Sequence, residues 1–218
     1  MNFYQQLQND TAAEREHLLA APVIEACRNG NINIDMYIAF LAQAFYHVSH
    51  TVPLLMAAGG RMSAEYEGVR GAIAEYIEEE YGHQEWILND IRACGGDAEA
   101  VRAGRPVFSI ELMIAFLYDQ IYRLNPMGIF GMVHVLEGTS VAIATTVADQ
   151  LQQGLKLPAN ALSYLSSHGS LDKEHLVFFA TLMDKVENSE DRQAIIHSAK
   201  VVYRLYGDML RGLTEDRP

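Results

Sequence analysis

Apolar residues recur at steps of three and four along most of the chain, and they do not alternate with polar ones. That spacing places apolar side chains on one face of an α-helix, whereas a half-buried strand requires alternation. Few helix-breaking residues interrupt the pattern, since the 218 residues include 16 glycines and 6 prolines. The periodicity therefore predicts an all-α fold built from long helices.

The interruptions predict a bundle of about seven helices, and the length suits one domain covering residues 1–218. The expected helices cover approximately 11–30, 34–58, 63–94, 109–125, 127–154, 158–186 and 189–212. Thr11 and Glu14 have the spacing of a capping box at the start of the first of these helices. Pro53 is expected to kink the second, and Pro158 suits the first turn of the sixth.

The composition and the net charge disfavour several classes of partner and of protein. The formal net charge is −12, from 16 basic and 28 acidic residues, which disfavours nucleic acid and anionic membranes as partners because both attract positive charge. We expect no transmembrane helix and no secretory signal. Cys27 and Cys94 are too few for a disulfide scaffold. These features predict a cytoplasmic globular protein.

Polar residues interrupt the apolar faces of three expected helices. Six of them lie on these faces or beside them: Glu80, His83, Glu137, His168, Asp172 and His175. Burying an unpaired carboxylate is costly, and no lysine or arginine accompanies these acids on the same faces. A pair of divalent ions would compensate the charge, and mixed nitrogen and oxygen ligands suit iron or manganese. The acid-x-x-His spacing at residues 80–83 and 172–175 is the one that carboxylate-bridged di-iron bundles use.

Some alternatives stay open at this point. Each of the six residues, taken alone, is more often a hydrogen-bonded core residue, and only their combination indicates a metal centre. Glu79 is the alternative to Glu80 as the first carboxylate. His47 and His50 fit either a role around the metal or ordinary hydrogen bonding in the core. His134, one turn before Glu137, is a weaker candidate ligand.

Three segments resemble a known family: EEYGH at 79–83, LEGTS at 136–140 and SHGSLDKEH at 167–175. Over residues 37–186 the chain resembles the haem-oxygenase-like iron-containing redox enzymes. These are di-iron oxidases and oxygenases that share a fold with the thiaminase-type TenA proteins and the quinone-cofactor synthase PqqC. The resemblance implies one haem-oxygenase-like helical domain. It also implies a carboxylate and a histidine from the first core helix, a glutamate from the second and a His/Asp/His set from the third, which are the same six residues.

The resemblance implies an oxygen-activating non-haem di-iron oxidase or oxygenase that acts on a small-molecule metabolite. The resemblance also implies two iron ions, with manganese as the alternative metal, and dioxygen as cosubstrate. An external electron donor and a homodimer are compatible with such an enzyme. Amines, amino acids and fatty acids are all substrates within the family, and nothing in the sequence selects among them.

Three other functions remain to be weighed. A TenA-like metal-free hydrolase needs a nucleophilic cysteine in the pocket, and neither Cys27 nor Cys94 is expected beside Glu137. A haem oxygenase needs one proximal histidine and basic residues for the propionates, so six clustered ligands exceed its requirements. A non-catalytic binding protein could use the same metal site, and metal analysis combined with oxygen consumption would separate it from an enzyme.

Overall fold

The computed structural model describes the backbone of residues 1–214 and the side chains in that range except those of 144, 145 and 168–175. This part of the chain is all-helical, with no β-strand in it. Its twelve α-helices are α1 (Phe3–Asp10), α2 (Ala12–Leu19), α3 (Pro22–Arg28), α4 (Ile34–Val48), α5 (Thr51–Arg61), α6 (Glu67–Glu80), α7 (His83–Ala93), α8 (Ala98–Ala103), α9 (Phe108–Asp119), α10 (Ile129–Leu155), α11 (Ser163–Asp184) and α12 (Ser189–Gly212). Shorter helical turns occupy Ala64–Tyr66, Gln120–Leu124, Pro126–Gly128 and Ala159–Ala161.

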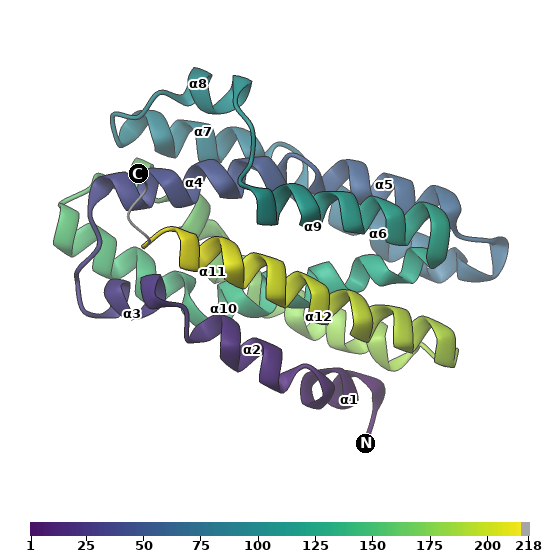
Figure 1. Cartoon of the computed structure of the whole chain (residues 1–218). Coiled ribbons are helices and arrows are strands. Elements are labelled where there is room, and N and C mark those ends of the chain that lie inside the picture. Colours follow the sequence, from purple (N-terminus) through teal and green to yellow (C-terminus); the bar gives the residue numbers. More distant parts are fainter. Residues whose placement is uncertain (215–218) are drawn as a thin grey trace.

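Most of these helices run along the long axis of an elongated bundle (Figure 1). The long helix α10 packs against both α11 and α12, and α12 also contacts α2 and α9. On the other side α4 packs against α7, and α7 contacts α11. Gly131 lets α10 and α12 approach closely, because a Cβ at this position would lie 2.5 Å from the backbone nitrogen of Ala199.

The expected number of helices was too low because the first three predicted helices are each divided and because α1 and α8 lie outside the seven predicted ranges. The backbone of Ala21 is extended before Pro22, which separates α2 from α3, as expected for a residue that precedes proline. Thr11 makes no side-chain cap, and its hydroxyl donates to the carbonyl of Leu7 at 2.7 Å instead. The capping box lies at Asn2, where the backbone N–H of Gln5 donates to the side chain of Asn2 and the backbone N–H of Asn2 donates to the side chain of Gln5.

The other two divided segments carry candidate site residues. The predicted helix 34–58 breaks between α4 and α5 after Val48, and Pro53 is the third residue of α5. Proline fits there because the first turn leaves its backbone N–H groups without intrahelical partners. The predicted helix 63–94 breaks at Gly82, whose φ of 92° ends α6 and starts α7. A left-handed backbone of this kind favours glycine.

The second half of the chain agrees more closely with the prediction. The chain breaks at Asn125 and Pro126 as expected, α10 spans nearly the predicted range, and α12 spans Ser189–Gly212 as predicted. The sixth helix is the exception, because Pro158 precedes a short turn and α11 begins only at Ser163. A residue of α7 caps the first turn of α11, and this role was not predicted from the sequence.

That residue is Asp90 of α7, whose side chain is fully buried. One carboxylate oxygen accepts from the backbone N–H of Ser163 at 3.1 Å and from the Ser163 hydroxyl. The other accepts from the backbone N–H of Tyr164 at 2.9 Å. Because the N-terminus of a helix carries partial positive charge, a carboxylate is well placed here. Asp90 therefore fixes the start of α11 against α7.

His134 of α10 is a second buried polar residue, 1% exposed. Its ring stacks on Phe179 with centroids 5.9 Å apart, and its Nε2 lies 3.4 Å from the Thr11 hydroxyl. Desolvation, reinforced by the charge of Arg15, lowers the pKa of His134 from 6.5 to about 4. This histidine therefore connects the N-terminal helices to the core as a neutral ring.

One segment of the described chain, Pro126–Ile143, is long and apolar enough to cross a membrane by length and composition, and 56% of it is buried inside the bundle. A core helix of a globular protein passes the same test. The burial agrees with the role of α10 at the centre of the packing.

We predict that Asp90→Ala lowers the free energy of unfolding by about 2–4 kcal/mol, because it removes a buried carboxylate that accepts three hydrogen bonds at a helix N-terminus. Denaturant unfolding followed by circular dichroism measures the change. Asp97→Ala is the control, since Asp97 caps the short, peripheral α8. If Asp90→Ala lowers the free energy of unfolding no more than Asp97→Ala does, the role of Asp90 at the start of α11 is contradicted.

We also predict that His134 makes stability depend on pH between about 4 and 6.5. In this range the unfolded chain binds a proton at His134 and the native chain does not, so stability falls as the pH decreases, by up to about 3 kcal/mol. His134→Phe keeps an aromatic ring and removes the titration. Urea unfolding at pH 7 and pH 5 should therefore show a smaller loss in this variant than in the wild type. Equal losses would show that another group is responsible.

Candidate metal centre

A cavity of about 50 Å³ lies among α4, α5, α6, α10 and α11, and it brings several of the candidate residues together. Its described lining consists of His47, Val48, Thr51, Leu55, Tyr76, Glu80, Met132, Val133, Leu136, Glu137, Ser140 and Tyr164. Glutamates from two different helices and a histidine from a third thus border one space. We call this space the acidic cavity.

Glu80 and His83 lie on either side of the break at Gly82. Glu80 is the last residue of α6 and His83 is the first of α7. The carboxylate Oε2 of Glu80 lies 3.2 Å from Nδ1 of His83. The His83 ring also lies over Trp86, with centroids 4.0 Å apart and planes tilted by 31°. The two predicted ligands are therefore neighbours, although the predicted continuous helix 63–94 is divided between them at Gly82.

The structure distinguishes the two candidate glutamates at the end of α6. Glu80 is half-buried and lines the acidic cavity, whereas Glu79 is exposed. Tyr76, one turn before Glu80, is fully buried and lines the same cavity, and its ring meets Phe178 edge-on. The inner face of α6 therefore presents Tyr76 and Glu80.

Glu137 comes from the middle of α10 and lines the same cavity as Glu80. One of its carboxylate oxygens, Oε2, is buried from solvent. The described lining includes no lysine or arginine. Desolvation and a neighbouring carboxylate both disfavour the ionised form of an acid, so a cation in this space would stabilise both glutamates.

The histidine that borders the cavity with them is His47 of α4, which is 4% exposed. Its ring meets Tyr206 edge-on at 5.5 Å between centroids. His50, by contrast, interacts through Nδ1 with the hydroxyl of Tyr118 at 3.0 Å and does not line the cavity. Of the two histidines in α4 and its C-terminal flank, only His47 is therefore placed to act at the site. His134, packed against Phe179, does not line it.

The side chains of His168, Asp172 and His175 lie outside the described residues. Their backbone positions belong to α11, which is continuous from Ser163 to Asp184 and packs against α10 and α7. Among the described side chains alone, no three of His, Cys, Asp or Glu are grouped so as to hold a metal ion. Carboxylate oxygens with imidazole nitrogen are nevertheless the donors that iron and manganese take, so the described residues fit an iron centre.

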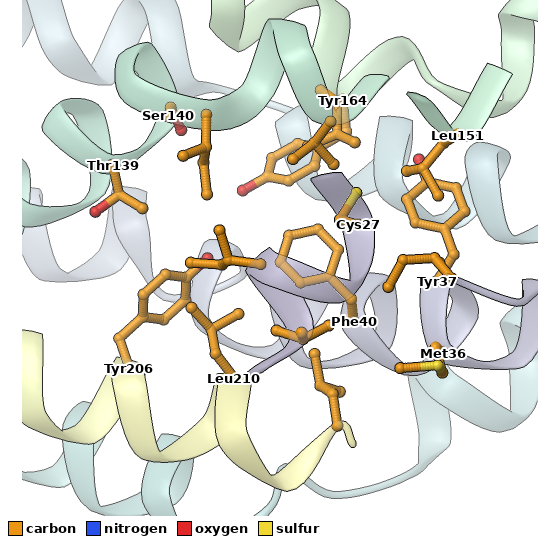
Figure 2. Close-up of a pocket in the computed structure, with 17 residues that line it drawn as sticks. Cys27, Met36, Tyr37, Phe40, Thr139, Ser140, Leu151, Tyr164, Tyr206 and Leu210 are labelled. Atoms are coloured by element: carbon orange, nitrogen blue, oxygen red, sulfur yellow. The ribbon is translucent and has the colours of Figure 1, made fainter. Parts of the chain in front are cut away.

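A second, apolar cavity adjoins the acidic one (Figure 2). It has a volume of about 90 Å³ and lies among α3, α4, α10, α11 and α12. Ser140 and Tyr164 line both cavities. Figure 2 shows Thr139, Ser140 and Tyr164 on one side of the space and Phe40 with Leu210 on the other. We call this space the apolar chamber.

These tyrosines and hydroxyl residues were not predicted from the sequence as parts of a site. Tyr76, Ser140 and Tyr164 occur at ordinary helical spacing, and tyrosine and serine in helices are common in packed cores. One available signal was that Ser140 follows Glu137 by three residues, which places both on one side of a helix.

Cys27 lines the apolar chamber and not the acidic cavity, as expected for a residue distant from Glu137. Burial raises the pKa of its thiol. A protonated thiol is a poor nucleophile, so this position does not provide the activated cysteine that a metal-free hydrolase needs.

The fold and the acidic cavity define a helical bundle with a carboxylate and histidine centre at its interior, and comparison with known proteins specifies the class. A family model described as iron-containing redox enzyme matches residues 38–207. The chain therefore belongs to this family of iron-containing redox enzymes. A comparison with curated protein sequences gave no match.

Solved structures show the same haem-oxygenase-like fold. A domain of unknown function with a heme oxygenase-like fold from Shewanella denitrificans is 19% identical with a TM-score of 0.86, and the match covers 98% of this chain and 92% of that one. A TenA homologue from Pseudomonas syringae is 14% identical with a TM-score of 0.75, covering 95% and 92%. Heme oxygenase-1 from Synechocystis, in complex with heme, is 9% identical with a TM-score of 0.76, covering 98% and 93%.

We predict that Glu80 is required for iron binding and that its neighbour Glu79 is not. Glu80→Ala should lower the affinity for ferrous iron by at least about tenfold, since it removes a carboxylate donor from the cavity. Glu79→Ala changes the same residue type at an exposed position and should bind iron as the wild type does. Anaerobic titration with iron determination measures both. If Glu79→Ala weakens iron binding more than Glu80→Ala does, Glu79 is the ligand.

Proposed function

We propose that the protein is an oxygen-activating non-haem iron oxidase or oxygenase that acts on a small-molecule metabolite. Its di-iron centre would be held by Glu80, His83, Glu137, His168, Asp172 and His175. The observation that carries this proposal is the convergence of Glu80, Glu137 and His47 on one interior cavity. Membership of the iron-containing redox enzyme family supports it.

The described residues account for how the site would be organised. Glu80 of α6 and Glu137 of α10 would supply negative charge to the metal from two different helices. Trp86 restricts the orientation of the His83 ring, and Nδ1 of His83 faces Glu80. Bound ferrous iron would supply the electrons that reduce dioxygen, and an external donor would restore them. The apolar side chains around the acidic cavity, among them Leu55 and Met132, limit the access of water.

Two functions found on the same fold are less compatible with the cavity. A haem with its two propionates requires positive charge, whereas two glutamates and no described lysine or arginine line the acidic cavity. A TenA-like hydrolase requires an activated thiol, whereas Cys27 is buried in the apolar chamber with a raised pKa. A non-catalytic metal-binding protein would share the site and is distinguished by experiment.

The decisive measurement is oxygen uptake by the protein loaded with ferrous iron under anaerobic conditions. We expect about two iron ions per chain, and rapid oxygen consumption with an optical change when air is admitted. Iron binding without oxygen consumption would identify the non-catalytic alternative. Absence of bound iron would contradict the proposal.

A matched pair of variants in α11 tests the ligand set. His175→Ala should lower iron binding by at least about tenfold and abolish oxygen consumption while the helical content is unchanged. Glu174→Ala is the control, because adjacent residues in a helix lie about 100° apart around its axis. Equal iron contents in wild type and His175→Ala, or equal losses in both variants, would show that the His/Asp/His motif does not bind the metal.

A further inference from the structure

One face of α10 connects the acidic cavity to the apolar chamber. Glu137 lines the acidic cavity, and Ser140, three residues later, lines both spaces. Ile143, Val147 and Leu151 continue along the helix and line only the chamber. These residues follow at three- and four-residue intervals, so they share a face of the helix. A molecule in the chamber thus lies beside the same helix face that presents Glu137.

The chamber has no charged residue in its described lining. Its wall is formed mainly by aliphatic and aromatic side chains, including Ile24, Phe40 and Leu210. One of its phenol groups, Tyr37, already donates to the carbonyl of Ala161 at 2.9 Å. Thr139, Ser140, Tyr164 and Tyr206 add hydroxyl groups but no charge, so a charged group would lose its hydration here without an opposite charge to compensate it. An uncharged apolar group is therefore the occupant that the chamber favours.

The volume of the chamber sets the scale of that group, and the chamber is partly open. A cavity of about 150 Å³ lined by Leu, Ile and Phe accommodates benzene, which has six carbons. The chamber, at about 90 Å³, scales to about four carbons. Ser140 and Tyr164 at the junction would then contact the part of the molecule nearest to Glu137.

We propose that the substrate carries a compact uncharged alkyl group of about four carbons that occupies the apolar chamber, and that it presents its reacting atom to the acidic cavity between Ser140 and Tyr164. This inference rests on the proposed function for the identity of the reacting centre. The binding of an alkyl group in the chamber does not depend on iron. The proposed function and the alkyl-binding site can therefore be disproved independently of each other.

The first experiment uses 4,4,4-trifluorobutan-1-ol and metal-free protein, with binding followed by fluorine NMR. We expect saturable binding to the wild type. Val147→Phe should weaken it at least about tenfold, because the larger ring fills the chamber. Thr146→Phe is the control at the adjacent, exposed position of the same helix. Ile143→Phe, which also lines the chamber, replaces Val147→Phe if that variant does not fold.

Chain length tests the size limit. Each additional buried methylene increases affinity about fourfold. If the chamber admitted four more methylenes, 8,8,8-trifluorooctan-1-ol would therefore bind roughly two-hundredfold more tightly than the four-carbon probe. We expect a gain of less than about tenfold. No saturable binding of the four-carbon probe, an equal effect of the Val147 and Thr146 variants, or a gain near two-hundredfold would each overturn the inference.

Paramagnetic broadening tests the position of the chamber relative to the metal centre. Manganese bound at the acidic cavity should strongly broaden the fluorine signal of the bound four-carbon probe, and magnesium should not. If manganese binds and the signal stays sharp, the chamber does not serve this centre and the inference is wrong. If the protein binds neither iron nor manganese while the probe still occupies the chamber, the proposed function fails and the apolar site remains.

Discussion

The buried carboxylate of Asp90 is the contact on which the geometry of the candidate centre depends. It joins α7, which begins with His83, to the first turn of α11, the helix that contains positions 168, 172 and 175. A carboxylate in a fully buried position is stable only where hydrogen bonds and charge compensate its desolvation. The N-terminus of α11 provides both, through two backbone N–H groups and the positive end of the helix dipole. The position of α11 along α7 is thereby fixed.

The central helix α10 lines both cavities. Its middle segment contributes Glu137 to the acidic cavity, and its C-terminal half contributes aliphatic residues to the apolar chamber. The same helix approaches α12 closely at Gly131 and packs along α11. Since a long rigid helix moves as a unit, the acidic cavity and the chamber keep a constant relation to each other. A substrate held in one would be oriented for reaction in the other.

Apolar periodicity and Gly or Pro breaks predicted the helical class and several of the helix boundaries, because they report local backbone preference. The family was predicted from the resemblance of three segments, 79–83, 136–140 and 167–175. The division of the first three helices was not predicted. The break at Gly82 depends on a left-handed glycine, and the apolar pattern continues across it from Ile73 to Ile91. The late start of α11 depends on Asp90, which is 73 residues distant in the chain. Contacts of this kind have no local signature.

The site was likewise predicted only in part. The inward positions of Glu80 and Glu137 follow from helical periodicity, and both line the acidic cavity in the structure. Whether His47 or His50 faces that cavity could not be decided from sequence, because it depends on where α4 ends and α5 begins.

A final consequence concerns the acid in α10. The segment Pro126–Ile143 is apolar enough to resemble a membrane span, yet Glu137 lies within it and borders an interior cavity. An acid at such a position lowers the stability of the fold unless its charge is compensated. Glu80 lines the same cavity, so its like charge adds to that cost. Iron bound in this cavity would use carboxylate oxygens of this kind as ligands. The metal would then stabilise the bundle as well as supply its chemistry.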